Sequence, residues 1–260
     1  MEDRDLADRG GMKGRTGGRS MRRVSTRFAI AAILCASAAL VLPAQEKKPA
    51  TTKEMTIEEL FLKSVEFQVL REKAFSDDYE MKMNALDDLE KKIADGSAGA
   101  NDAQAGFVLE YLALEGSARL NRENGRVVNY FPEVRRRAAG MLGRLGTEDA
   151  KNALVRVLLI DDEPMVKAEA AYALGVTGIN QDNEVVQVLA YTYDHEDPTK
   201  PDNNFAYAIV LAIEKLSQKT SGGLTDPAGY RTLVKIAQGN YIRTVKTKAL
   251  QVLDELKATK

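Results

Sequence analysis

The sequence predicts an all-α protein built from stacked pairs of helices, and three observations support this prediction. The chain has 260 residues, with no tryptophan, seven prolines and 29% charged residues, a composition typical of helical proteins. A mostly apolar pattern with helical spacing recurs between residues 134 and 256. A second amphipathic segment separates its successive copies. A helix pair repeated in this way buries its apolar face only against its neighbours, which predicts one stacked domain.

The recurring pattern marks the first helix of each pair. Its positions lie 4, 7, 8 and 11 residues after the first one, and these steps share one face of an α-helix. The copies start at Val134, Val166, Phe205 and Val245. A further copy, starting at Met81, is degenerate because charged residues take two of its positions.

The second helices are predicted at residues 102–115, 148–160, 183–193 and 227–238. Phe107 belongs to the apolar face of the first of them. A leading helix at 56–75 opens with a capping box, in which Thr56 and Glu59 satisfy each other's backbone amides. The folded part therefore contains about five pairs, or 10–11 helices.

Prolines and glycines fall near the expected helix ends. Pro132, Pro164 and Pro227 suit the first helical turn, where the missing amide proton has no partner to lose. Asp226 is the predicted N-cap before Pro227. Five glycines are expected near C-terminal ends, where a left-handed residue is often needed: Gly143, Gly146, Gly175, Gly178 and Gly239.

The N-terminal segment has a different character from the rest of the chain. Residues 1–44 carry eight basic and four acidic side chains, whereas residues 45–260 carry 29 and 34, a net charge of −5. Three arginines precede an apolar run at 28–42, and Ala44 stands before a polar stretch. This pattern is that of a secretory signal peptide. We expect export to the periplasm or cell envelope, with a mature chain that begins at Gln45.

Two membrane-tethered alternatives remain open. The run at 28–42 would act as an anchor if it were not cleaved, although it is short for a membrane span. Cys35 would act as a lipid-attachment site, although Leu34 precedes it and the apolar run continues beyond it. Residues 45–55 are predicted to be a disordered linker, and residues 56–260 the folded domain.

Two segments carry a family resemblance. PEVRRRAAGMLGRLG (132–146) and PMVKAEAAYALGVTG (164–178) resemble short HEAT-like repeats, while residues 203–217 and 241–257 match only in apolar spacing. The resemblance implies a right-handed α-solenoid whose concave face is lined by the second helices. It also implies that the basic residue after the valine, Arg135 or Lys167, bridges to an acid of a neighbouring turn or repeat.

No constellation of catalytic or cofactor-binding residues is recognisable. The single histidine, His195, lies among acidic residues, and we interpret this segment as a solvated loop rather than a cation site. The acidic cluster Asp161–Glu163 is expected to cap the next helix. We therefore predict no catalytic, cofactor-binding or metal-binding residues, and a protein that is not an enzyme. Export and the negative mature charge argue against a nucleic-acid partner.

The predicted function is that of an exported scaffold or adaptor that binds another protein through its concave face or its inter-repeat loops. The predicted partner-binding residues lie on the second helices: Lys151, Arg156, Gln187, Tyr191, Arg231 and Lys235. Tyr193 and Tyr230 would be further anchors if exposed. The loops at 119–129 and 194–204 are further candidates. An arginine cluster, Arg135–Arg137 with Arg144, offers an alternative phosphate or acidic-partner patch.

Two rival functions stay open. The protein would be a membrane-tethered structural component of an envelope complex if residues 28–42 or a lipidated Cys35 were retained. It would be a lyase-type enzyme if its groove held buried acids or aromatic residues, since HEAT-like repeats also occur in pigment lyases.

Overall fold

The computed structural model describes residues 56–98, 103–118, 120–219, 224 and 226–258. The predicted signal peptide, Cys35 and the linker lie outside the described residues. Within the described ranges, no helix combines the length and apolar character that a membrane crossing requires. Residues 54–260 form one compact unit.

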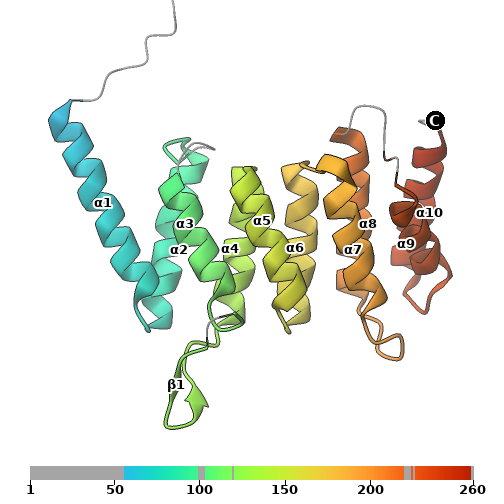
Figure 1. Ribbon diagram of the computed structural model, residues 1–260, viewed down its shortest axis with the longest axis horizontal. Helices are drawn as coiled ribbons and strands as arrows, with labels where there is room; N and C mark the ends of the chain where they lie inside the picture. The colour runs from blue at the N-terminus through green and yellow to red at the C-terminus, as the bar shows by residue number, and fades with distance from the viewer. Residues whose placement is uncertain (1–55, 99–102, 119, 220–223, 225, 259–260) are drawn as a thin grey trace, which may run out of the picture. The chain divides into compact units, whose positions relative to one another are not determined.

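Ten α-helices make up the described part of this unit, and Figure 1 shows them side by side in chain order. They are α1 (Ile57–Phe75), α2 (Tyr79–Ala94), α3 (Ala103–Leu114), α4 (Pro132–Leu145), α5 (Glu148–Ile160), α6 (Pro164–Thr177), α7 (Glu184–Asp194), α8 (Asn203–Lys219), α9 (Pro227–Gln238) and α10 (Arg243–Ala258). A 3₁₀ turn, η1 (Gln181–Asn183), precedes α7. The predicted all-α solenoid is confirmed.

The helices form two layers. The first-helix layer contains α2, α4, α6, α8 and α10, and the second-helix layer contains α3, α5, α7 and α9; neighbours within each layer are in contact. The described residues therefore form four complete pairs with α1 before them and α10 after them, rather than five pairs. The first position of each predicted copy is buried, with Val134, Val166, Phe205 and Val245 at most 3% exposed. The recurring stripe is the core of the stack.

The predicted helix boundaries rest on local interactions that the structure contains. The Thr56–Glu59 capping box is present, and the three prolines begin α4, α6 and α9. Asp226 caps α9 by accepting a hydrogen bond from the amide of Ala228. Gly146 and Gly178 end their helices with φ of +63° and +70°, as expected of left-handed caps.

Two glycines serve packing instead of helix termination. Gly143 and Gly175 lie inside α4 and α6. A Cβ atom on Gly175 would lie 2.5 Å from Cα of Ala212 in α8, and one on Gly143 would lie 2.8 Å from Cβ of Ala173 in α6. These glycines let neighbouring first helices approach closely, so their expected left-handed role was wrong. Gly239 also ends its helix in an extended conformation rather than a left-handed one.

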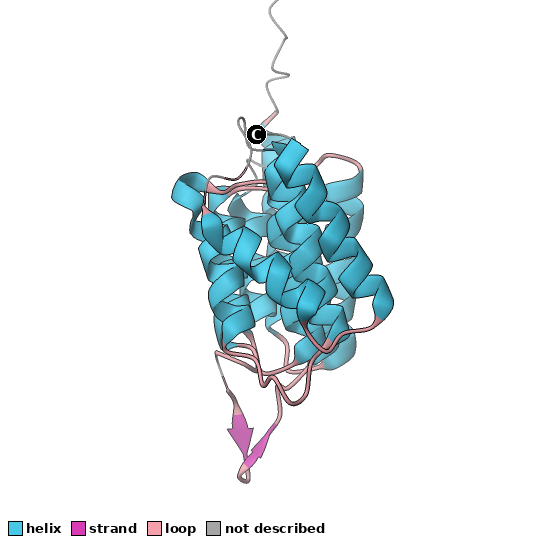
Figure 2. Cartoon of the chain, turned by 90° about the vertical axis from the view of Figure 1, so that its right-hand side faces the viewer, coloured by secondary structure: helices cyan, strands magenta, loops and turns pink. Residues whose placement is uncertain are grey.

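The insertion after α3 forms a small hairpin. Strands β1 (Arg122–Glu123) and β2 (Arg126–Val127) pair antiparallel across Asn124 and Gly125, both of which have positive φ. An Asn-Gly pair favours this tight turn because both residues adopt positive φ at low cost. The hairpin extends beyond the ends of the helices (Figure 2).

An ion pair recurs at the same place in three repeats, and it is buried in two of them. Arg135 donates from Nε to Asp161 Oδ2 at 2.6 Å and from Nη2 to Oδ1 at 3.1 Å, and both side chains are fully buried. Lys167 of α6 pairs with Glu196, which follows α7 in the same repeat. The bridging predicted for both basic residues is confirmed. Burial disfavours the charged form of Arg135, but its hydrogen bond and attraction to Asp161 outweigh this effect, so the pKa of Arg135 is raised.

The third pair joins Lys82 and Glu115, with 2.6 Å between Nζ and Oε2 and both side chains buried. Each of the three pairs connects a first helix to the end of the second helix in the same repeat. Asp161 therefore has a different role from the predicted cap of α6. It binds Arg135 and accepts a hydrogen bond from the amide of Glu163, while Glu163 makes no side-chain cap.

Candidate functional site

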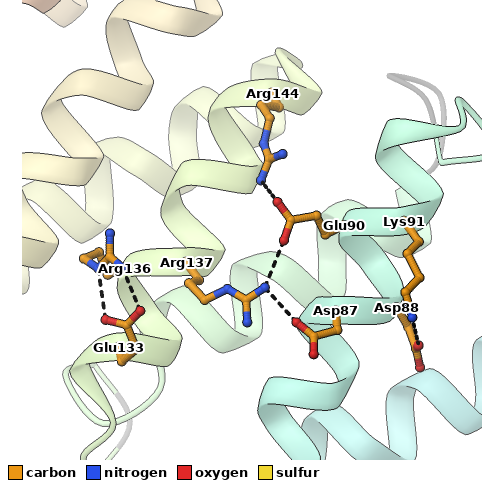
Figure 3. Close-up of polar contacts among 8 residues, drawn as sticks. All are labelled: Asp87, Asp88, Glu90, Lys91, Glu133, Arg136, Arg137 and Arg144. Carbon is orange, nitrogen blue, oxygen red and sulfur yellow. Dashed lines mark hydrogen bonds and ion pairs between the residues drawn. The ribbon is translucent and has the colours of Figure 1, made fainter.

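The arginine cluster of α4 connects it to neighbouring helices (Figure 3). Arg137 and Arg144 both bind Glu90 of α2, each with an Nη2–carboxylate distance of 2.9 Å. Arg136 makes two hydrogen bonds to Glu133, at 3.0 and 2.7 Å. Hydrogen bonds from Arg144 and Arg137 lower the pKa of Glu90. All four arginines of the cluster are thus paired with acids of the stack, and none of them is an unpaired guanidinium group offered to an anion.

The second-helix layer contains all six residues that were predicted to bind a partner. Four of them form polar contacts between neighbouring repeats. Arg156 of α5 lies 2.7 Å from Glu110 of α3, and Lys151 of α5 lies 2.6 Å from Glu184 of α7. These contacts hold neighbouring second helices in register.

The same arrangement continues toward the C-terminus. Gln187 of α7 donates to Asp226, the N-cap of α9, at 2.8 Å. Lys235 of α9 lies 2.7 Å from Asp194 at the end of α7. The hydrogen bond from Gln187 is the largest cause of the lowered pKa of Asp226, and the positive charge of Arg231 adds to it. One polar contact or more therefore links each adjacent pair of second helices.

Lys151 was expected to be exposed, and this expectation was wrong. Its side chain is only 7% exposed because Glu184 and Glu148 cover its ammonium group from two sides. Arg156, Gln187, Arg231 and Lys235 are exposed as expected.

A pocket of about 420 Å³ lies between α3 and α5. Phe107 and the Arg156–Glu110 pair line it, together with Asn152 and Thr147. Phe107 was predicted to lie on the buried face of its helix, but it is 53% exposed and meets Phe75 only edge-on, with ring centroids 6.2 Å apart. An exposed aromatic ring beside a charged pair is the most distinctive surface feature of this layer.

The tyrosines of the C-terminal repeats differ in exposure. Tyr191 is 56% exposed and stacks on His195 with ring centroids 4.0 Å apart. Tyr230 is half-buried and donates to the carbonyl of Leu256 at 3.1 Å. Tyr193 is also half-buried, and burial raises its pKa. Tyr191 is therefore the one exposed anchor among the three.

His195 contacts the backbone and the ring of Tyr191. Its Nδ1 atom lies 2.8 Å from the carbonyl oxygen of Tyr191. Across the part of the chain that the structure describes, no three His, Cys, Asp or Glu side chains gather closely enough to hold a metal ion.

The fold and its repeated ion pairs define a two-layered helical-repeat protein, and the comparisons with known proteins specify the kind of repeat. Residues 127–200 match the family model for HEAT repeats. The structure is similar to that of the complex of CpcE and CpcF of phycocyanin lyase from Nostoc sp. PCC7120, with a TM-score of 0.50 and 17% identity over 84% of this chain and 72% of that chain. A search of curated proteins gave no match. Residues 127–200 are therefore similar to HEAT repeats, and the described chain on both sides of them continues the same helical-repeat fold.

The comparison with solved structures corrects one prediction. The chain was predicted not to be an enzyme because it has no recognisable catalytic motif. This prediction was wrong, because a similar fold occurs in a phycocyanin lyase complex. A missing motif gives no ground for excluding catalysis from this fold.

Proposed function

We propose that this protein binds a partner protein through the exposed surface of its second-helix layer, from α3 to α9. The observation that carries the proposal is Phe107, an exposed aromatic side chain that borders the pocket between α3 and α5. Aromatic and arginine side chains are the residue types that most often dominate binding energy at protein interfaces. Phe107, Arg156 and Tyr191 supply both types on this layer.

The polar contacts between second helices support the same surface. Because Arg156–Glu110, Gln187–Asp226 and Lys235–Asp194 link successive repeats, the exposed side chains are held at fixed spacing. A surface that is ordered before binding loses less conformational entropy on association. The hairpin at 119–129 and the loop at 194–204 are proposed to contact the same partner.

Site-specific photo-crosslinking in the native cell tests this proposal. A photoreactive phenylalanine analogue would replace Phe107 in one variant and Leu250 of α10 in the control variant, since both side chains are 53% exposed. We expect one specific protein adduct from position 107 and none from position 250. The same adducts from both positions, or adducts from position 250 alone, would refute the proposed surface.

We also propose that the protein is exported and acts in the periplasm or cell envelope. The basic segment, the apolar run at 28–42 and Ala44 support this address. Cell fractionation followed by N-terminal sequencing tests it. A chain that starts at Gln45 supports export with cleavage, and a retained apolar run would identify the protein as membrane-tethered.

A lyase-type activity is the second candidate function, because a similar fold occurs in the phycocyanin lyase complex. In that case the pocket between α3 and α5 would hold the reacting group, with Glu110 and Asp149 as its acidic side chains. Intact-mass spectrometry of the partner identified by crosslinking, purified from cells that contain or lack the protein, separates the two functions, because the cell supplies any group that would be transferred. A covalent mass change that is lost in Glu110→Gln supports the enzyme, and an unchanged mass supports binding alone.

A further inference from the structure

Helix α1, the first helix of the described residues, carries a row of large apolar side chains that no other described element covers. Ile57, Phe61, Leu62, Val65 and Val69 of α1 are 82%, 67%, 60%, 40% and 50% exposed. The opposite side of the same helix is buried against the stack, where Leu70 is 4% exposed and Ala74 is fully buried. We call the five exposed side chains the α1 stripe.

A terminal helix of a repeat stack normally presents a polar outer face. The C-terminal helix follows this rule, because the exposed side chains of α10 are polar apart from Leu250 and Ala258. Helix α1 does not follow this rule, because its stripe is apolar and exposed. Only one of the two terminal helices is therefore suited to an apolar contact. A head-to-tail arrangement of copies would need both ends to be apolar, so a symmetric contact between two α1 helices is favoured.

The exposed area suits a specific interface. With about 150–200 Å² of surface for each large apolar side chain, the five exposed fractions amount to about 500–600 Å² on one copy. A contact that covered the whole stripe on two copies would remove up to about 1,000–1,200 Å² from water, which reaches the roughly 1,000 Å² expected of a biological interface. Apolar patches of more than a few hundred Å² are unusual on monomers.

The stripe is complementary to itself. Its main positions, 57, 61, 65 and 69, are evenly spaced by four residues, so an antiparallel partner brings 57 opposite 69 and 61 opposite 65. A groove of about 430 Å³ runs beside the stripe between α1 and α2, and Leu62, Val65, Val69 and Leu70 line it. The stripe of each copy thus has a groove in the other copy to occupy, as ridge-into-groove packing requires.

Acidic side chains beside the stripe favour a second copy over an anionic lipid surface. Such a lipid surface would meet the carboxylates of Glu58, Glu66 and Glu72.

We propose that α1 is a homodimer interface, in which two copies pack their α1 helices antiparallel about a two-fold axis near residue 63. This interface is separate from the proposed partner surface on the second-helix layer.

Sedimentation equilibrium of the full chain tests the proposal. At micromolar concentration we expect twice the mass of the single chain, which is 28.5 kDa for residues 1–260 and correspondingly smaller for a chain that begins at Gln45. Phe61→Glu should weaken the dimer by about 100-fold, since it buries a charge at the centre of the contact. It should leave the helical circular dichroism unchanged because Phe61 is exposed in the monomer. Leu250→Glu, which places the same charge on α10, should leave the dimer intact.

Disulfide formation tests the orientation. In a background without Cys35, mixing Phe61→Cys with Val65→Cys chains should give mixed disulfides faster than either variant alone forms its own.

Three results would overturn the proposal. The first is a monomeric wild-type chain, whether residues 28–42 of the same chain cover the stripe or nothing does. The second is a dimer that survives Phe61→Glu. The third is a dimer that crosslinks fastest between two Val65→Cys chains, as a parallel pair would.

Discussion

Replacement of glycine by alanine at positions 175 and 106 should change stability in opposite directions. Both glycines lie inside helices, in α6 and α3. Alanine favours a helix over glycine by about 1 kcal/mol. At Gly106 an added Cβ atom meets nothing within 4 Å. Gly106→Ala should therefore stabilise the protein by about 0.5–1 kcal/mol.

At Gly175 the added Cβ atom would lie 2.5 Å from Cα of Ala212 and 3.1 Å from its carbonyl oxygen. Carbon atoms prefer separations of about 3.5–4 Å, so α6 and α8 would have to separate by about 1 Å. Overpacking of this kind costs about 1–3 kcal/mol. After the gain in helix propensity, Gly175→Ala should destabilise the protein by about 1–2 kcal/mol.

Urea unfolding of both variants and the wild type, followed by circular dichroism, measures the difference. The two substitutions are chemically identical, so a difference in sign reports the close contact between first helices alone. If Gly175→Ala is as stable as Gly106→Ala, the two first helices do not approach as closely as described, and the tight stack is refuted.

Three further predictions concern ion pairs and export. Arg135→Met should cost about 3–5 kcal/mol in urea unfolding, because it leaves the buried carboxylate of Asp161 without a positively charged partner; Asp161→Leu in the same chain should recover much of this loss. Folding lowers the pKa of Glu90. Glu90 therefore contributes to stability above its ordinary pKa of 4.5, and this contribution is lost as the pH falls through the lower pKa of the folded protein. Acid unfolding should therefore depend less on pH in Glu90→Gln. Edman sequencing of the exported protein should begin at Gln45.

The helical pattern was sufficient to predict most of the fold, because the core stripe repeats in the sequence itself. The structure contains the helices predicted at residues 148–160 and 227–238 with the same bounds. Caps such as Asp226 depend on neighbours a few residues away, so they also follow from local sequence.

The degenerate copy at Met81 needed information that lies elsewhere in the chain. Asp88 and Lys92 interrupt its stripe because α2 faces α1 there, where they pair with Lys73 and Glu66 at 2.7 and 2.8 Å. No local pattern specifies such partners. The ion-pairing role of Lys82 could have been predicted from the sequence, since Lys82 follows Met81 as Arg135 follows Val134.

The candidate site was less predictable than the fold, because exposure depends on how neighbouring helices cover each residue. Lys151 is covered by Glu148 and Glu184, and Phe107 is uncovered although it belongs to an apolar set. Likewise, the arginines of α4 resemble an anion site only until the acids of α2 are placed beside them.

The central claim is tested most directly by measuring how tightly the partner protein, once identified by crosslinking, binds variants of the second-helix layer. By isothermal titration calorimetry, Phe107→Ser should weaken binding by at least about tenfold, the loss expected of an anchor residue. Leu250→Ser, at a position of equal exposure on α10, should leave the affinity unchanged within about twofold. A partner that loses affinity with Leu250→Ser and keeps it with Phe107→Ser would contradict the assignment of the second-helix layer as the binding surface.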